Sequence, residues 1–283
     1  MDLSNENVIH IKKDGIEYLQ FRKLLEYRDI INHAYSLGTN MDFRTSRENG
    51  ELSKEEYTNS LNNYDKLCTS IGCNYKNLVK GIQKHTNNVK IVSKKINKDT
   101  PDFKCQEYEN VDGLITNKNN LILASTSSDC ISLLFFDPAK KVIANIHSGW
   151  KGTLQRISIK TVEKMVNEFS CKPKDIICCI CPSIRKRHFE VEEDVKDMFE
   201  KEFQDLGEDN FKKIIEKKIP NRKWLIDTVL INKIILERNG LKKENIIDSK
   251  ICTMCNPEIL HSYRVERKNY GLNTALIELK ENS

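Results

Sequence analysis

Short apolar runs alternate along the chain with longer segments in which apolar positions recur every three to four residues. The short runs are four to six residues long, as expected of strands buried in a core. They predict strands at Val8–Ile11, Val89–Val92, Leu121–Ala124, Ile131–Phe136, Val142–Ile146, Asp175–Ile180 and Ala275–Leu279. The longer segments predict helices at Lys54–Ile71, Thr153–Phe169 and Ile226–Asn239, the last ending before Gly240.

This mixture of strand hairpins and helices predicts an α+β protein, an α/β sandwich in which mixed β-sheets are flanked by helices. We find no internal repeat and no linker rich in Pro, Gly or Ser. The sequence therefore predicts a single domain over residues 1–283.

Composition narrows the class of protein. With 39% hydrophobic and 31% charged residues, the chain resembles a globular protein, and its net charge of +5 is too mild to favour a nucleic-acid partner. No apolar run is long enough to span a membrane, and the polar start of the sequence is unlike a signal peptide. Ten dispersed cysteines are typical of free thiols in a reducing compartment, so we expect a cytoplasmic location.

The segment Ser127–Thr153 combines two apolar strands with chemically active residues. The turn Asp137–Lys140 sets Phe136 opposite Lys141, and counting outward places Cys130 opposite His147. Directly opposed residues share one face of the sheet. The sequence therefore predicts a cysteine and a histidine side by side at the open end of a buried hairpin.

A Cys–His pair has three interpretations, which the hairpin leaves open. The histidine stabilises a nucleophilic thiolate, or both side chains bind zinc, or a buried thiol merely lies beside a capping histidine. The following loop favours a ligand site, because Gly149 allows close backbone approach and Lys151 adds a cation. We expect Thr153 to cap the next helix, whose first N–H groups would favour an anion.

At these residues the chain resembles the YfiH/YlmD family, also called laccase-domain proteins. The resemblance extends over about residues 33–279, with Ser148 and Lys151 in place of the family's usual alanine and arginine and Leu272 where arginine is common. The matching blocks lie in the family's order: Gln83–Val89, Asp129–Cys130, Ile146–Thr153, Pro182–Val191, Trp224–Asn232 and Cys252–Gly271.

The resemblance implies a purine nucleoside phosphorylase that also has adenosine deaminase activity. Its substrates would be phosphate and adenosine, inosine, guanosine or methylthioadenosine. Carried over residue by residue, the zinc ligands are His85, Cys130 and His147, and copper could take the same site. Cys130, Asp129 and His147 would be catalytic, with Asp129 either an acid–base group or an orienting partner of a ligand histidine. Candidate substrate-binding residues are Lys151, Arg264, Gly149 and Thr153.

Three other functions are alternatives to this one. A metal-free Cys130/His147 hydrolase acting on cell-wall precursors would keep its activity after metal removal. A metal-binding protein without catalysis would turn over no nucleoside. A multicopper polyphenol oxidase needs more histidines than the chain's six, which are His10, His33, His85, His147, His188 and His261.

Two Cys-x-x-Cys spacings, Cys178–Cys181 and Cys252–Cys255, could together form a second zinc site. The first lies in a strand-like run where side chains alternate between faces, so buried thiols are the favoured interpretation.

Overall fold

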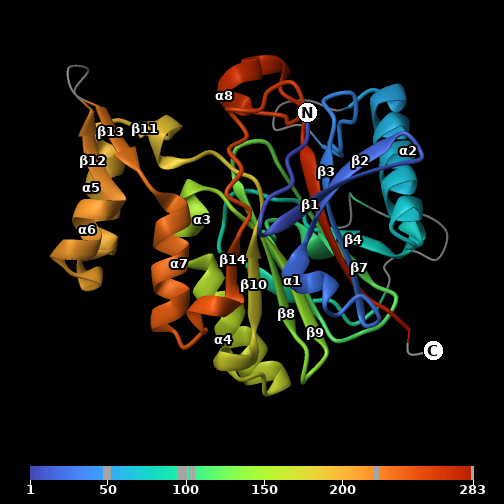
Figure 1. Ribbon diagram of the computed structural model, residues 1–283, viewed down its shortest axis with the longest axis horizontal. Coiled ribbons are helices and arrows are strands. Elements are labelled where there is room, and N and C mark those ends of the chain that lie inside the picture. Colours follow the sequence, from blue (N-terminus) through green and yellow to red (C-terminus); the bar gives the residue numbers. More distant parts are fainter. Residues whose placement is uncertain (47–51, 95–100, 102, 104–105, 219–222, 282–283) are drawn as a thin grey trace.

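Two stacked sheets form the centre of the molecule (Figure 1). In this computed structural model residues 1–46, 52–94, 101, 103, 106–218 and 223–281 are described. Within them, the first sheet has six strands in the order β1-β2-β3-β15-β7-β4, and the second has six in the order β14-β10-β8-β9-β6-β5. A smaller sheet, β11-β13-β12, lies at one side.

The strand bounds of the first sheet are β1 Val8–Lys13, β2 Ile16–Phe21, β3 Ile31–Leu37, β4 Leu78–Lys80, β7 Ile122–Ser127 and β15 Asn273–Leu279. Those of the second are β5 Val89–Ile91, β6 Gly113–Thr116, β8 Ile131–Asp137, β9 Val142–Ser148, β10 Ile177–Ile180 and β14 Ile246–Asp248. The small sheet consists of β11 Glu190–Val191, β12 Ile215–Lys218 and β13 Lys223–Ile226.

The side chains of β8 alternate between two cores, which shows how the layers pack together. Leu133 and Phe135 pack into the core shared with helices on the outer face of the second sheet. Leu134 and Phe136 pack into the core between the two sheets. Because successive side chains of a strand point to opposite faces, a continuous apolar run is what a strand covered on both sides requires.

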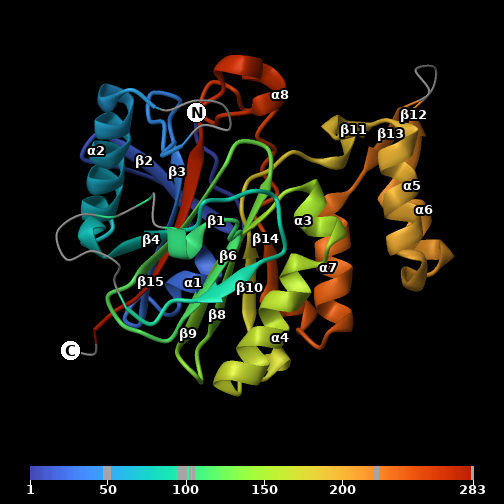
Figure 2. The same cartoon turned by 180° about the vertical axis from the view of Figure 1, so that it is seen from behind.

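Helices cover the outer faces of both sheets (Figures 1 and 2). Helix α2 packs on the first sheet through Tyr64 and Leu67, and α4 and α7 cover the second. Ser53 starts α2 with a reciprocal capping box to Glu56. The helix bounds are α1 Arg22–Leu25, α2 Lys54–Ser70, α3 Trp150–Leu154, α4 Ile157–Phe169, α5 Glu193–Glu202, α6 Glu208–Ile214, α7 Thr228–Arg238 and α8 Tyr263–Glu266.

The predicted fold class is confirmed: mixed sheets are stacked and flanked by helices. Each predicted strand has a counterpart, although Asp175 lies in a 3₁₀ turn before β10. None of the described helices is both long and apolar enough to cross a membrane.

The predicted helix Thr153–Phe169 is wrong at its start. The segment forms two helices, α3 and α4, because Arg156 adopts a left-handed conformation with φ of 55° between them. Its guanidinium binds Glu202 and Asp205 at 2.7 Å each, which ties the break to a distant segment. Gly149, not Thr153, is the N-cap of the helix that contains Thr153.

The buried histidine His33, on β3, makes the stability of the fold depend on pH. Burial lowers the pKa of His33 to about 3, and the Phe21 N–H donates at 2.8 Å to Nε2, the nitrogen that protonation would need. Between about pH 6.5 and 3 the unfolded chain therefore binds a proton that the folded chain does not, and stability falls as pH falls. From pH 7 to pH 5 this histidine should remove about 2 kcal/mol from the free energy of unfolding.

The measurement is urea unfolding at both pH values for the wild type and His33→Gln, whose amide oxygen can still accept from Phe21. On acidification from pH 7 to pH 5, the free energy of unfolding should fall by about 2 kcal/mol less in the variant than in the wild type. Equal losses in the two proteins would contradict the prediction.

Candidate active site

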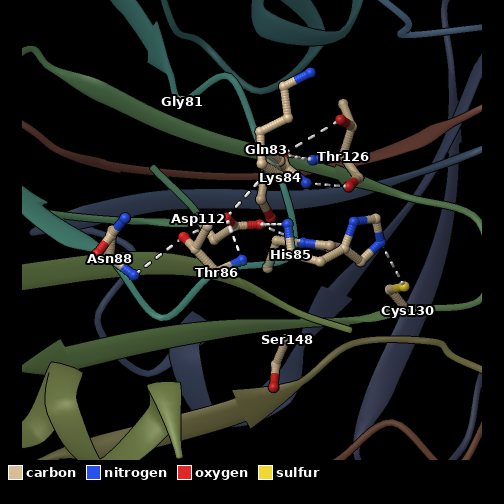
Figure 3. Close-up of polar contacts among 12 residues, drawn as sticks. Gly81, Gln83, Lys84, His85, Thr86, Asn88, Asp112, Thr126, Cys130 and Ser148 are labelled. Carbon is tan, nitrogen blue, oxygen red and sulfur yellow. Dashed lines mark hydrogen bonds and ion pairs between the residues drawn. The ribbon is translucent and has the colours of Figure 1, made fainter. Parts of the chain in front are cut away.

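Three side chains meet at one end of the sandwich. One nitrogen of His85, one of His147 and the Cys130 sulfur all lie within 4.8 Å of one another. His85 Nε2 is 3.9 Å from Cys130 Sγ (Figure 3). The imidazole rings of His85 and His147 lie edge to face, with 4.9 Å between their centroids. His147 is buried, whereas His85 and Cys130 are partly exposed, so the cluster can be reached from solvent.

The β8–β9 hairpin positions two of the three. The register pairs Ser132 with His147 and Ile131 with Ser148, so the predicted pairing of Cys130 with His147 is wrong by two residues. The cause is Asp137, which extends β8 and moves the four-residue loop along by one. Because the error is an even number, Cys130 still lies on the same face as His147.

His85 belongs to a loop that connects the two sheets. It lies in the loop that leaves β4 of the first sheet and enters β5 of the second, with a left-handed φ of 59°. Gln83 anchors this loop by accepting from the Thr126 N–H at 2.9 Å and donating to the Thr126 carbonyl at 2.8 Å. The imidazole is therefore carried across the end of the sandwich to the cysteine.

Asp112 holds the histidines in place, a role the sequence analysis missed. Its carboxylate accepts from the backbone N–H of Lys84, His85 and Thr86 at 2.8–3.1 Å and from the Thr86 hydroxyl at 2.8 Å (Figure 3). It also accepts from His147 Nδ1 at 2.9 Å. Since Nδ1 is engaged, Nε2 of His147 is the nitrogen available to a ligand.

A sequence signal for Asp112 did exist. It directly precedes β6, whose Gly113 pairs with Ile146 of β9, so continuing the register brings Asp112 beside His147. The His147 N–H donates to the Asp112 carbonyl at 2.7 Å. Finding this required the β6–β9 pairing, which the sequence analysis did not include.

The electrostatics of the cluster favour charged side chains. Burial raises the pKa of the Asp112 carboxyl, but the hydrogen bond and charge of His147 and the bonds from Thr86 outweigh it and lower the pKa to about 2. Burial likewise opposes ionisation of Cys130, yet the charge of His147 lowers its pKa to about 6. Burial lowers the pKa of His147, while Cys130 and Asp112 raise it to about 10. Without metal, the pair is thus a thiolate beside an imidazolium.

Gly149 lies against the cluster. A Cβ atom built there would stand 2.7 Å from His85 Cδ2, 3.1 Å from Cys130 Sγ and 3.5 Å from His147 Cε1. The close approach predicted for this glycine is therefore toward the ligand side chains themselves.

The carboxylate of Asp129, next to Cys130, is held by residues from the C-terminal part of the chain. It accepts from the Thr253 hydroxyl at 2.6 Å, the Ser262 hydroxyl at 2.8 Å and the Arg264 backbone N–H at 2.8 Å. Among the described contacts, the residue that orients a ligand histidine is therefore Asp112, while Asp129 ties the start of α8 to Cys130.

The candidate substrate-binding residues divide into two groups. Lys151 is exposed two residues after Gly149, with its Nζ 5.5 Å from the Trp150 ring centroid, and the Arg264 guanidinium, partly buried, donates to the Glu190 carbonyl at 2.9 Å. Thr153 is buried in a polar group with Ser148 and Asn232, at 3.0 and 3.3 Å. Thr153 thus shapes the loop, whereas the two cations remain accessible.

Two imidazole nitrogens and one thiolate match the ligands that zinc prefers. Three protein ligands leave a fourth tetrahedral position for water or substrate, the arrangement of catalytic rather than structural zinc sites. The carboxylate–histidine contact supplied by Asp112 is the usual outer support of such a ligand. The residues present therefore fit a zinc ion, and copper is compatible with the same donors.

Fold and site together define an α/β-sandwich protein with an open His–Cys–His ligand cluster. Residues 39–280 match the family described as multi-copper polyphenol oxidoreductase laccase. The chain belongs to this family, which confirms the resemblance drawn from the sequence.

Individual relatives are distant. A mouse protein named purine nucleoside phosphorylase LACC1 is 28% identical over 223 residues, 77% of this chain and 47% of the mouse protein, so the chain spans about half that relative's length. A protein of an unknown prokaryotic organism named adenosine deaminase RL5 is 26% identical over 208 residues, 74% of this chain and 76% of that protein. The crystal structure of the Bacillus licheniformis hypothetical protein YfiH has the same fold, with a TM-score of 0.78 at 21% identity, covering 93% of this chain and 96% of that one.

Replacing Asp112 by Asn should lower zinc affinity by about 10–100-fold, because His147 loses the carboxylate that orients it. A competition titration with a chromophoric chelator measures this. Asp137→Asn is the matched control: Asp137 is also buried but caps the turn at the far end of the hairpin. Equal affinities in the two variants would contradict the role given to Asp112.

Gly149→Ala should also weaken zinc binding, by about tenfold or more, because the new methyl group displaces the His85 ring. Gly152→Ala is the control in the same loop, since its Cβ would approach the Thr86 carbonyl only to 3.3 Å. The same titration compares them, with circular dichroism to verify folding. A folded Gly149→Ala protein with unchanged affinity would show that the ring is not confined there.

Proposed function

We propose that this protein is a purine nucleoside phosphorylase that also deaminates adenosine, at a zinc site formed by His85, Cys130 and His147. The observation that carries the proposal is the open three-ligand cluster supported by Asp112. The names of the mouse and prokaryotic relatives support the two reactions. The proposed partners are a purine nucleoside and phosphate, without nucleic acid or membrane, and the ten dispersed cysteines support a cytoplasmic setting.

Deamination needs a nucleophilic water at the purine ring. Bound zinc supplies this chemistry by lowering the pKa of a coordinated water. The protein's part is to present His85 and His147 through neutral nitrogens and Cys130 as thiolate. Asp112 keeps a proton on Nδ1 of His147, which leaves the Nε2 lone pair directed to the ligand position.

Phosphorolysis needs an oxyanion held near the sugar. Arg264 and Lys151 are the cations proposed for it, because the Arg264 backbone is fixed by Asp129 beside Cys130 and Lys151 is two residues from Gly149. Lysine replaces the family's usual arginine at position 151, which retains the charge but loses the bidentate fork. We therefore expect phosphate binding to depend more on Arg264 than on Lys151.

A Cys130/His147 hydrolase is the second candidate. It is favoured by the thiolate–imidazolium pair of the metal-free site, in which the pKa of Cys130 falls to about 6. Zinc should have opposite effects on the two candidate activities. The nucleoside enzyme requires it, whereas the hydrolase would lose its nucleophile, because zinc would bind the Cys130 thiolate.

The test is base release from adenosine and inosine, with and without phosphate, and inosine formation from adenosine, using protein of measured zinc and copper content. Zinc-loaded wild type should release base only with phosphate. Cys130→Ala should slow both reactions by at least about 100-fold, because bound metal contributes several kcal/mol to such steps. Cys73→Ser, at a cysteine on the far side of the first sheet, is the control.

The outcomes separate the candidates. Turnover that is abolished by a chelator and restored by zinc supports the proposal. Activity that survives chelation, but is lost in Cys130→Ala, would replace it with the hydrolase. Equal inactivity of folded, zinc-loaded wild type and variant on every nucleoside would refute nucleoside chemistry at this site.

A further inference from the structure

A second cluster of metal-ligating side chains lies outside the candidate active site. One nitrogen of His188 and the sulfurs of Cys252 and Cys255 lie within 4.8 Å of one another. His188 Nε2 is 3.1 Å from Cys255 Sγ. We infer that these three residues bind a second zinc ion, at a site independent of the proposed enzyme activity.

The chain path explains why the two thiols converge. Cys252–Cys255 forms a turn, in which the Cys255 N–H approaches the Cys252 carbonyl at 3.3 Å and the Asn256 side chain donates to the same carbonyl at 2.7 Å. A turn brings residues i and i+3 to one side, as in the Cys-x-x-Cys ligand pairs of structural zinc sites. Cys178 and Cys181 in and after β10 have the same spacing but pack into cores on opposite faces of the sheet.

The histidine comes from a separate segment that is fastened to this turn. His188 ends the 3₁₀ turn Lys186–His188, and Ser183 just before it forms a parallel bridge with Cys252. The Arg185 guanidinium donates to the Ile251 carbonyl at 3.0–3.1 Å and to Asp248 at 2.8 Å. The three ligands are therefore held in place by contacts that involve no metal.

A cation lies beside the exposed sulfur of the cluster. The Arg187 guanidinium donates to Cys255 Sγ at 2.8 Å. Outer hydrogen bonds of this kind orient the ligands of protein metal sites.

A disulfide between Cys252 and Cys255 is the competing interpretation of the same spacing. The nearness of His188 Nε2 to the exposed sulfur favours a metal, because two thiolates and one imidazole are a common zinc donor set, whereas a disulfide needs no third group. The disulfide is therefore an outcome to be tested.

The second site is close to the first but shares no ligand with it. Thr253, within the Cys252–Cys255 turn, donates to Asp129, and Ile184 donates its backbone N–H to the Asp129 carbonyl at 2.9 Å. Glu190, two residues after His188, accepts from Arg264. Zinc in the second site would thus join two segments that hydrogen-bond to Asp129 and Arg264, which makes its role structural.

The experiment measures how many zinc ions the full-length protein binds. The protein is purified with reductant and loaded with zinc, and excess metal is then removed. Wild type should hold about two zinc ions, Cys130→Ala and Cys255→Ser about one each, and the double variant none, because each variant loses one ligand of one site. Met254→Ala, in the same turn but at a residue type that zinc seldom uses as a ligand, is the matched control and should hold as much as wild type. The melting temperature of Cys130→Ala should rise on zinc addition, and that of the double variant should not.

Cobalt identifies which site is filled. Charge-transfer absorption of Co²⁺ bound in Cys130→Ala should be about twice that in Cys255→Ser, because two thiolates coordinate the metal instead of one. Equal zinc content in wild type and Cys255→Ser would overturn the inference. So would the loss of two thiols in wild type but not in Cys255→Ser when both are prepared without reductant and their thiols are counted after unfolding in chelator, which would assign the pair to a disulfide. Nucleoside turnover is not a readout, so failure of the proposed function would leave this result intact.

Discussion

The arrangement of the candidate site depends on one buried carboxylate. Asp112 accepts from three consecutive backbone N–H groups of the loop that carries His85 and from the ring of His147. It therefore joins a loop leaving the first sheet to a strand of the second and sets the distance between the two histidines. A buried carboxylate is costly unless it is fully hydrogen-bonded, and here the same bonds that offset its burial also orient the site.

The position of the site follows from how the sandwich is built. Strands such as β8 and β9 are buried along their whole length, so their interiors hold mainly apolar side chains. Polar chemistry is confined to the strand ends, where Cys130 precedes β8 and His147 lies near the end of β9. The edge of the sandwich is also where a loop can cross from one sheet to the other.

The surroundings of each cysteine decide whether its thiol is inert or reactive. Burial among apolar residues raises the pKa of Cys178 and Cys179 well above the ordinary value, which leaves them inert packing groups. Cys130 beside His147 has a lowered pKa, and Cys255 accepts a hydrogen bond from Arg187. Each of the two proposed metal sites thus contains one thiol that adjoins a cation.

By itself the sequence determined what depends on neighbours along the chain: the apolar strands, α2 with its capping serine, the hairpin with Cys130 and His147 on one face, and the family motifs. For the β8–β9 hairpin, the sequence predicted which side chains share a face but not which residues pair. Side chains alternate between faces with a period of two, whereas nothing in the local sequence marks where the loop begins. Asp112 was missed because its signal requires the pairing of β6 with β9, which brings together residues 35 apart in the sequence. The left-handed break at Arg156 and the meeting of His188 with Cys252 and Cys255 likewise depend on segments far apart in sequence. Such pairings are decided when the layers pack, since only then do these side chains acquire their neighbours.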